Sequence, residues 1–398
     1  MSPLDTLAIA DDRGVAIQNP ARVLRILLVI ESSGGGSARH VADLAAGLLR
    51  RGHAVEVAFS PRRADSWFVE ELESLPLAGL HRLHMQRNPG LDDIRSAKEL
   101  RELLRHRGPF DLIHGHSAKA GALVRLAGAG MPGKKLYTPH AFITLDPELP
   151  FSRRLIYTVA ERLLGSLADG IICVSAEEQL HAQSDLGLDA RLLFTVENGL
   201  HRLPPADRSA ARATLQLAPD DVCAGFVGRI SAQKAVDRLI KAFAALSPRC
   251  PHLVLAIVGD GPDLPGIRDL AQKLQVADRI RFTGSADGVS LMPGFDFFVL
   301  PSQYEAFPYV YLEALARGLP IITTAVGGAS AIVDSGLNGY VVPQESLVQL
   351  EHCMEKLAGD SELRERMSRT SLEKSELRTL DVMVGNTLAV YEKVLAAS

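Results

Sequence analysis

Two glutamates, Glu305 and Glu313, stand eight residues apart in the segment Ser302–Gly318, which reads SQYEAFPYVYLEALARG. Pro308 lies between them before a helix-forming run, and its fixed φ and missing N–H suit the first helical position. Glu305 would then lie just outside the helix and Glu313 within it, so both carboxylates could face a group across the helix N-terminus. Such an end binds anions, and carboxylates accept hydrogen bonds from hydroxyls. The pattern indicates an anion flanked by polyols, as in a nucleotide-sugar.

The alternative is a solvated surface, which is the more common setting for two glutamates around an amphipathic helix. The preceding run Phe295–Pro301 (FDFFVLP) favours a site, because it is typical of a buried parallel strand. Ligands of open α/β sheets gather beyond the carboxyl ends of such strands, which is where Glu305 lies.

Two cations follow another strand-like run. Val222–Val227 ends in Gly228 and Arg229, and Lys234 leads into a helix with an apolar stripe. An arginine and a lysine near a helix start have the chemistry of a diphosphate clamp. Two solvated cations in a turn are the alternative.

A glycine-rich turn, Gly34–Gly36, separates the apolar strand Leu24–Ile30 from an amphipathic helix. A strand, such a turn and a helix N-terminus form a candidate anion-binding unit. The three adjacent glycines lack the G-x-G-x-x-G spacing, so a plain dinucleotide site is not supported. A flexible turn is the alternative.

Histidines mark two further strand ends. His114 and His116 stand two apart in DLIHGHS, a spacing that could suit zinc, but no third ligand is evident nearby. A loop that lines a cleft is the favoured interpretation. His140 ends the short run Tyr137–His140 and is a site candidate by position, with a core or capping histidine as the alternative.

Composition bounds the class of protein. With 398 residues, 47% hydrophobic and 23% charged, the chain can bury two cores. A net charge of −4 and 5% aromatic residues give no case for a nucleic-acid partner. No apolar run approaches the roughly 18 residues of a membrane span, and residues 1–20 are expected to be a loose tail without a secretory signal. The four cysteines lack metal-ligand spacing and are expected to be reduced in a cytoplasmic protein.

Strands and helices alternate through both halves of the chain, and each half begins with a strand, a glycine turn and a helix. This predicts an α/β protein of two Rossmann-like domains with parallel sheets, facing each other across a cleft. The expected divisions are a tail over 1–20, an N-terminal domain over 21–200, a C-terminal domain over 201–379 and a last helix over 380–398.

A cationic helix is expected over Leu91–Arg107, with five arginines and lysines against Glu99 and Glu102. It is interpreted mainly as a solvated face, with contact to an anionic membrane surface as the alternative.

Taken in order, these motifs resemble the retaining glycosyltransferases of family 4, which have the GT-B fold, over nearly all of residues 22–397. The most specific element is the glutamate pair in its setting P-S-x-x-E-x-F-P followed by E-A-L-A-x-G-x-P. The supporting motifs are the glycine turn, R-G-H at Arg51–His53, D-L-I-H-G-H-S at Asp111, P-H at Pro139, N-G at Asn198, V-G-R with Lys234, and G-D-G-P at Gly259.

The resemblance implies roles for matching residues. Arg229 and Lys234 would hold the donor diphosphate, Glu313 the ribose, and Glu305 the hydroxyls of the transferred sugar, while His140 would sit beside the sugar. The implied catalytic residues are Glu305, His140, Arg229 and Lys234. The implied donor-binding residues are Gly35, Gly36, Arg229, Lys234, Gly284, Glu305, Ala306, Phe307, Tyr309, Val310 and Glu313. Acceptor-side candidates are Ser37, His116, Ser117, Lys119 and His140. The nucleotide-sugar is a co-substrate, and no metal or other cofactor is expected.

Two positions depart from the family pattern. Many members have glycine where Pro308 stands, so one N–H donor is lost here, although Tyr309 and Val310 can still donate. Glycine commonly follows the clamp lysine, where this chain has Ala235.

The segments HSAKAG and YTPHAF look like members that build bacterial exopolysaccharides or surface polysaccharides. The implied function is transfer, with retention, of a hexose or N-acetylhexosamine from a UDP-sugar, favoured over GDP, to a lipid-linked or growing glycan acceptor. Such an enzyme would work in the cytoplasm or at the inner face of the cytoplasmic membrane. The N-terminal half would bind the acceptor, and the last helix would cross back onto it. The alternatives are a nucleotide-sugar epimerase and a non-catalytic partner in a polysaccharide assembly complex; intact Glu305, Arg229, Lys234 and His140 argue against the latter.

Overall fold

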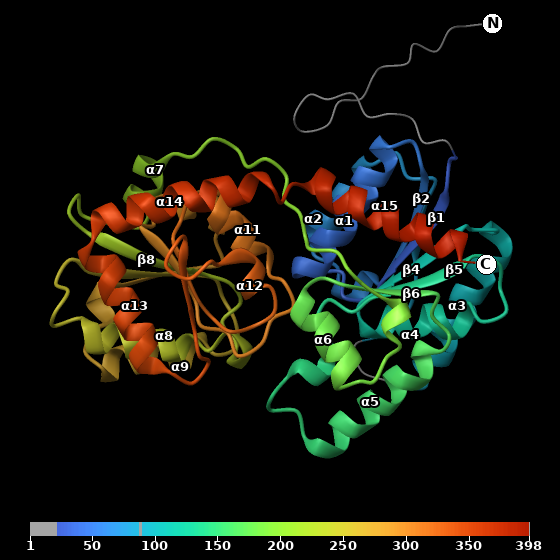
Figure 1. Cartoon of the computed structure of the whole chain (residues 1–398), viewed down its shortest axis with the longest axis horizontal. Coiled ribbons are helices and arrows are strands. Elements are labelled where there is room, and N and C mark those ends of the chain that lie inside the picture. The colour runs from blue at the N-terminus through green and yellow to red at the C-terminus, as the bar shows by residue number, and fades with distance from the viewer. Residues whose placement is uncertain (1–21, 87–89, 398) are drawn as a thin grey trace, which may run out of the picture. The chain divides into compact units, whose positions relative to one another are not determined.

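The computed structural model describes residues 22–86 and 90–397, so the expected tail over 1–20 lies outside the described residues. The chain divides into two compact units (Figure 1). Unit 1 comprises the described residues up to Thr144, Leu149–His201 and the segment from Thr379 onward. Unit 2 comprises Leu145–Glu148 and Arg202–Arg378.

Unit 1 is built on a seven-stranded parallel sheet with the order β3-β2-β1-β4-β5-β6-β7. Because the order reverses between β1 and β4, the carboxyl ends of these two strands form a switch point of the kind where ligands bind in α/β sheets. The strands are β1 Arg25–Ile30, β2 Ala54–Phe59, β3 Gly79–Arg82, β4 Leu112–His116, β5 Lys134–Thr138, β6 Gly170–Cys173 and β7 Leu193–Thr195. The helices are α1 Gly35–Arg50, α2 Ser66–Ser74, α3 Asp92–Arg107, α4 Ala118–Ala127, α5 Phe151–Gly165, α6 Ala176–Ser184 and α15 Leu380–Ala396.

Unit 2 repeats the plan with a six-stranded parallel sheet of order β10-β9-β8-β11-β12-β13. Its strands are β8 Val222–Val227, β9 Leu253–Val258, β10 Ile280–Gly284, β11 Phe297–Leu300, β12 Ile321–Thr324 and β13 Gly339–Val342. Its helices are α7 Arg208–Thr214, α8 Val236–Leu246, α9 Leu264–Lys273, α10 Gly288–Leu291, α11 Tyr309–Ala316, α12 Ala329–Ile332, α13 Leu347–Gly359 and α14 Ser361–Glu376. The predicted fold class, two Rossmann-like units with parallel sheets, is therefore confirmed.

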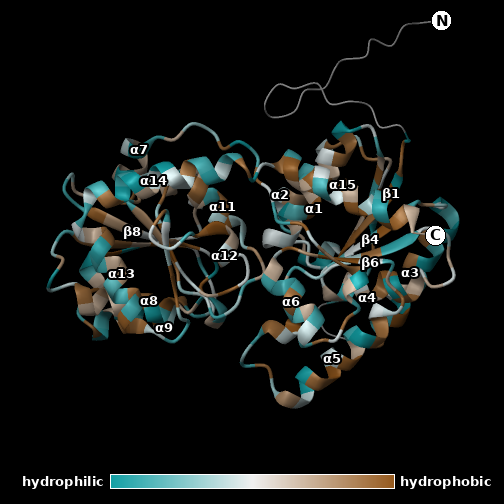
Figure 2. Cartoon of the chain, viewed as in Figure 1, coloured by the Kyte–Doolittle hydropathy of each residue, from teal (hydrophilic) through white to brown (hydrophobic). Residues whose placement is uncertain are grey.

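Burial on both faces explains the continuous apolar strands. In β1, Ile26, Leu28 and Ile30 pack in the cluster that holds α1, α2 and α15, whereas Leu27 and Val29 pack in the cluster that holds α3 and α4. Successive side chains of a strand point to opposite faces, so each face must be apolar when helices cover both. The hydrophobic colour of the strands inside each unit is visible in Figure 2.

Helix α15 completes unit 1 although it follows unit 2 in the chain. Tyr391 is fully buried, and its hydroxyl lies 2.7 Å from Nδ1 of His114 on β4. Arg51, after α1, reaches Asp381 with 3.0 Å between Nη2 and Oδ1. These contacts fix the last helix on the sheet that begins the chain.

The expected start of the helix after Glu305 differs from the structure by one residue. Helix α11 begins at Tyr309, and Pro308 is its N-cap, not its first helical residue, because the ψ of Pro308 is extended at 134°. Among the described residues, no helix combines the length and the apolar composition that a membrane span requires.

Candidate active site

The loop between β11 and α11 brings a glutamate and a lysine together. Glu305 is 7% exposed, and its Oε1 lies 2.5 Å from Nζ of Lys234. Ser302 donates its hydroxyl to the same carboxylate oxygen at 2.7 Å. A buried carboxylate held by a cation and a hydroxyl is oriented, so two residues that are 71 positions apart in sequence form one site.

The backbone of this loop is held on two sides. Gln233 accepts a hydrogen bond from the N–H of Gln303 and donates its side-chain amide to the carbonyl of Tyr304, at 2.8 and 3.0 Å. On the other side, a Cβ at Gly327 would lie 2.4 Å from the carbonyl oxygen of Glu305. Only glycine allows this approach, so Gly327 helps to position the glutamate loop.

Arg229, the second cation of the predicted diphosphate clamp, is accessible to a ligand. Arg229 follows β8, is exposed, and within the described part of the chain has no ion-pair partner. The aliphatic part of Lys234 lies near Gly228, whose ideal Cβ position is 3.6 Å from Cε of the lysine. Ala235, where the family commonly has glycine, adopts φ +46°. Lys234 therefore lies beside the strand end that carries Arg229, with its charge shared with Glu305.

Glu313 is half-buried in the second turn of α11. Burial lowers the pKa of the nearby Arg317, whereas the charges of Asp287 and Glu313 act in the opposite direction. Tyr309 and Val310 open the helix, and the first N–H groups of an α-helix lack intrahelical acceptors. Ala306 and Phe307 are buried in the loop before it. The predicted donor residues of this segment thus follow one another from the loop into the helix.

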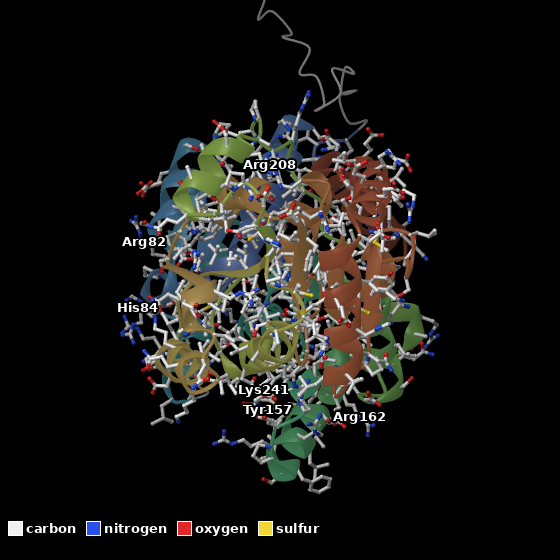
Figure 3. The ribbon with its side chains drawn as sticks, turned by 90° about the vertical axis from the view of Figure 1, so that its left-hand side faces the viewer. Arg82, His84, Tyr157, Arg162, Arg208 and Lys241 are labelled. Carbon is white, nitrogen blue, oxygen red and sulfur yellow. The ribbon has the colours of Figure 1, made fainter. Side chains whose placement is uncertain are left out.

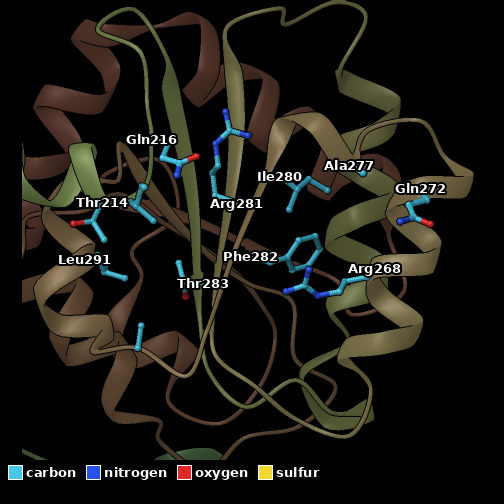
Figure 4. A pocket seen from close by; sticks show the side chains of 12 residues that line it. Thr214, Gln216, Arg268, Gln272, Ala277, Ile280, Arg281, Phe282, Thr283 and Leu291 are labelled. Atoms are coloured by element: carbon cyan, nitrogen blue, oxygen red, sulfur yellow. The ribbon is translucent and has the colours of Figure 1, made fainter.

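Gly284 ends β10 with φ +67°, a conformation that favours glycine, and no atom lies within 4 Å of its ideal Cβ position. Beside it lies a polar groove of about 600 Å³ (Figure 4). Figure 4 labels Gln216, Arg268 and Arg281 among the lining residues. None of the predicted donor residues lines this groove, so it is separate from the pair of Lys234 and Glu305.

In unit 1, the two histidines of the H-G-H motif lie side by side, with 4.1 Å between ring centroids, but they have different hydrogen-bond partners. His114 is a core residue, with its ring nitrogens 2.7 Å from the Tyr391 hydroxyl and 2.9 Å from that of Thr138. His116 is also buried, but its Nδ1 lies 3.1 Å from Nε2 of His140. Burial lowers the pKa of His114 to about 3. His116 and His140 therefore belong to a common site, whereas His114 has a structural role.

A third histidine, which the sequence did not single out, joins this pair. His40 on α1 stacks edge-on against His140 with 4.6 Å between ring centroids, and its Nδ1 lies 2.9 Å from Oδ1 of Asn198. Burial, reinforced for His116 and His140 by neighbouring histidines, lowers the pKa of all three rings. They are therefore neutral near pH 7.

The sequence showed no third ligand near the H-G-H motif, and in the structure His116, but not His114, has two further histidines beside it. Among the described residues, His40, His116 and His140 are the one group whose donor atoms converge, within 4.8 Å of one another, so that they could hold a transition-metal ion. The third histidine, His40, lies on the helix that starts at the glycine turn. Its distance in sequence from His116 and His140 gives no sign that the three rings meet. A shared ion would have to replace the hydrogen bond between His116 and His140.

Glu178 on α6 was also missed, and it holds the loop that carries His140. The side chain is 1% exposed, with Oε1 accepting from the N–H of Ala141 and Oε2 from that of Val174, both at 2.8 Å. His140 and Ala141 have φ +55° and +89°, which is strained for residues with a side chain. Burial raises the pKa of Glu178 to about 7, against the lowering effect of the N–H donors.

The glycine turn and the start of α4 hold the remaining candidates. Gly35 has φ +64° and donates its N–H to Asp65 at 3.0 Å, so a carboxylate of the chain itself lies at this helix N-terminus; Gly36 beside it is exposed. Ser37 donates its hydroxyl to the carbonyl of Ser32 at 2.8 Å. Ser117 is the N-cap of α4 with φ +75°, and Lys119 pairs with Asp93 at 2.6 Å.

Comparison with protein families identifies the class of protein to which this fold and these motifs belong. Residues 35–199 match the family described as glycosyl transferase 4-like domain, and residues 207–374 match the family glycosyl transferases group 1. The chain belongs to the family 4 glycosyltransferases of GT-B fold, as its motifs indicated.

Two proteins with similar sequences share one name. The chain is 30% identical over 388 residues to a D-inositol 3-phosphate glycosyltransferase of Actinosynnema mirum, covering 90% of this chain and 92% of that protein. A protein of the same name from Saccharomonospora viridis is 29% identical over 396 residues, with 91% and 90% covered.

Solved structures share the fold at lower identity. Sucrose-phosphate synthase of Thermosynechococcus elongatus superposes with a TM-score of 0.80 at 22% identity, covering 94% of this chain and 100% of that one. Anabaena HepE, in complex with UDP and glucose, gives a TM-score of 0.78 at 22% identity, with 93% and 99% covered.

Proposed function

We propose that this glycosyltransferase moves a hexose or N-acetylhexosamine from a UDP-sugar, with retention of anomeric configuration, to a lipid-linked or growing glycan acceptor in polysaccharide biosynthesis. It would act in the cytoplasm, at the inner face of the membrane where such acceptors are anchored. The observation that carries the proposal is the ion pair between Lys234 and the buried Glu305, which lies before α11, together with the exposed guanidinium of Arg229 at the end of the adjacent strand β8.

The charges of this group fit a donor diphosphate. Arg229 has a free guanidinium that could take two phosphate oxygens at once. Lys234 is held by Glu305, and an arriving phosphate could share that ammonium because lysine has three donors. The N-terminus of α11 adds N–H groups and a partial positive charge. Together these groups would neutralise a diphosphate without a metal ion.

Cleavage of the bond between sugar and phosphate builds negative charge on the leaving diphosphate. Arg229, Lys234 and the start of α11 would stabilise that charge in the transition state. The anomeric carbon becomes oxocarbenium-like, and the acceptor hydroxyl attacks from the face that the phosphate leaves, giving its proton to the phosphate. Glu305 then orients sugar hydroxyls and is not the nucleophile, since its carboxylate is committed to Lys234 and Ser302.

His140 would contact the transferred sugar as a neutral imidazole. A neutral ring has one donor and one acceptor nitrogen, which suits a sugar hydroxyl. Its strained backbone is held through Ala141 by Glu178, so the ring position is set before substrate arrives. His116, Ser117, Lys119 and Ser37 remain the acceptor-side candidates.

The donor base and the acceptor are inferred from different sources. UDP is favoured by the subgroup motifs, and HepE binds UDP and glucose. A second candidate function is transfer to a small phosphorylated polyol, because the relatives that match over nine-tenths of this chain are named D-inositol 3-phosphate glycosyltransferases. Competition of the two acceptor classes for transfer of one labelled sugar would separate these functions.

A transfer assay tests the proposal directly. The purified protein would be incubated with UDP-glucose, UDP-galactose or the matching N-acetylhexosamines and with lipid-linked or oligosaccharide acceptors. NMR of the product should show the anomeric configuration of the donor. An inverted linkage would overturn the retaining mechanism, and transfer to inositol 3-phosphate alone would replace the polysaccharide acceptor by the second candidate.

A further inference from the structure

Helix α5 exposes a row of large apolar side chains. Phe151, Leu155, Ile156, Val159 and Leu163 are 78%, 53%, 65%, 45% and 68% exposed, and Gly165 is the one fully buried residue of the helix. Four of the five stand at i, i+4, i+8 and i+12, with Ile156 beside them, so they share one side of the helix. Brown, hydrophobic segments are visible along α5 in Figure 2.

Two charged side chains of α5, Glu161 and Arg154, contact the rest of unit 1. Glu161 accepts from Nη1 of the fully buried Arg125 at 2.9 Å and lies 3.3 Å from the hydroxyl of Tyr137. Arg154 donates to the carbonyl of Thr144. A surface helix of a soluble domain normally turns its apolar side inward and its charges outward. In α5 the large apolar side chains point outward instead, which indicates an apolar partner outside unit 1.

Area and charge favour a lipid surface over a second copy of the chain. The five side chains expose roughly 500 Å², at the upper end of a single patch on a monomer and below the about 800 Å² per partner of a standard protein interface. The exposed charges of the helix are cationic. Arg153 and Arg162 are exposed, with Nε of Arg162 donating to the carbonyl of Leu186, whereas Glu161 is engaged inside. Figure 3 labels Arg162 on this helix.

The cationic helix α3, which the sequence indicated as a possible membrane contact, is a weaker candidate for membrane binding than α5. Arg95 pairs with Glu99, Arg107 pairs with Glu56, and Arg101 donates to carbonyls at the end of α4 and just after it. Three of the five cations of α3 are thus engaged within unit 1.

We propose that the outward side of α5 inserts into the headgroup region of an anionic phospholipid bilayer. Phe151, Ile156 and Leu163 would enter the acyl boundary, and Arg153 and Arg162 would meet lipid phosphates. This inference rests on the proposed function only for the biological role of membrane binding: a helix in the membrane interface would bring unit 1 to a lipid-linked acceptor.

Vesicle sedimentation with the full-length protein tests the proposal. The protein should pellet with vesicles of phosphatidylglycerol and phosphatidylethanolamine, and less with pure phosphatidylcholine or at high salt. The double variant Ile156→Ser/Leu163→Ser should lower the partition coefficient at least about tenfold. The matched control is Val348→Ser/Leu377→Ser in unit 2, whose side chains are 76% and 69% exposed. This control should pellet like the wild type.

Three results would overturn it: no pelleting of the wild type, equal pelleting of both double variants, or a wild-type dimer in sedimentation velocity that the α5 variant converts to monomer. The last would assign the surface to a second copy. The melting temperatures of both double variants should equal that of the wild type, since the replaced side chains are exposed. UDP binding measured without vesicles reports on the proposed function alone, so its failure and the failure of the lipid surface are distinguishable.

Discussion

At the residue scale, two cations are proposed to hold the donor diphosphate. Lys234 is 14% exposed at its side chain and shares its charge with Glu305, whereas Arg229 is open. The two cations therefore differ in role. Arg229 should contribute mainly to binding of the nucleotide, and Lys234 both to the leaving diphosphate and to the orientation of the glutamate.

Replacement of Lys234 by alanine should lower turnover. Loss of a preorganised cation at the leaving group raises the barrier by about 2–4 kcal/mol, roughly a 30- to 1000-fold loss in kcat. Lys241→Ala is the control, because Lys241 is an exposed lysine on the following helix that pairs with Asp237. Steady-state kinetics of both variants, with thermal unfolding as a check of folding, would measure this. Unchanged kcat for Lys234→Ala would remove that residue from the site.

Glu178 should make stability depend on pH. Burial raises its pKa to about 7, from an ordinary value of 4.5. The folded state therefore retains a proton that the unfolded chain releases, and the stability from this group is complete below about pH 4.5 and falls as the pH rises to about 7. Between pH 4.5 and 8 the wild type should lose up to about 3 kcal/mol relative to Glu178→Gln. Parallel denaturation free energies of the two proteins across this range would contradict the assignment.

Single residues show where sequence reasoning succeeded and where it failed. Glu305, Lys234 and Arg229 could be proposed because charge and spacing from a strand end carry local information. His40 and Glu178 could not, because their partners are about 100 or 37 positions away and depend on how β4, β5 and α6 are placed. His114 had the same local signal as His116, and only burial beneath α15 distinguishes it.

At the element scale, the loop between β11 and α11 depends on the close approach of Gly327. The Gly327→Ala substitution should disturb it, since the new Cβ would lie 2.4 and 2.5 Å from the carbonyl oxygens of Glu305 and Ala306. We expect weaker donor binding together with a lower melting temperature, measured by calorimetry and thermal unfolding. An alanine variant with wild-type affinity would show that the loop is not held by this contact.

Gly385 gives a contrasting glycine within α15. No atom lies within 4 Å of its ideal Cβ position, so Gly385→Ala meets open space. Because alanine restricts the unfolded chain and favours helix, the variant should gain about 0.5–1 kcal/mol in unfolding free energy. Chemical denaturation measures the gain, and a loss of stability would mean that this part of α15 is more closely packed than the structure indicates.

Elements with strong hydrophobic patterns were predictable from sequence. The expected range of β8 agrees with the structure, and the ends of α3 and the start of α15 agree within one residue. The short edge strand β3 was not anticipated, because Gly79–Arg82 has a mixed composition. The outward apolar side of α5 was not anticipated either, since an amphipathic pattern does not say which side faces the protein.

At the scale of the whole molecule, two parallel sheets with one chain crossing back were foreseeable from the alternation of strands and helices and from the family resemblance. In the proposed mechanism, Arg229, Lys234 and α11 would supply the positive charge that metal ions provide in other transferases. Treatment with EDTA should therefore leave transfer activity intact in the full-length protein. A loss of activity that Mg²⁺ restores would contradict the clamp model, and a loss that Zn²⁺ alone restores would direct attention to His40, His116 and His140.

The most direct measurement is calorimetric titration of the purified protein with UDP, GDP and ADP, for the wild type and for Arg229→Ala. The account predicts that UDP binds selectively, raises the melting temperature, and binds at least about tenfold more weakly to the variant, whose own stability is unchanged because Arg229 has no ion-pair partner among the described residues. Equal affinity of the two proteins, or no binding of any nucleotide, would contradict the assignment of this site to a nucleotide-sugar.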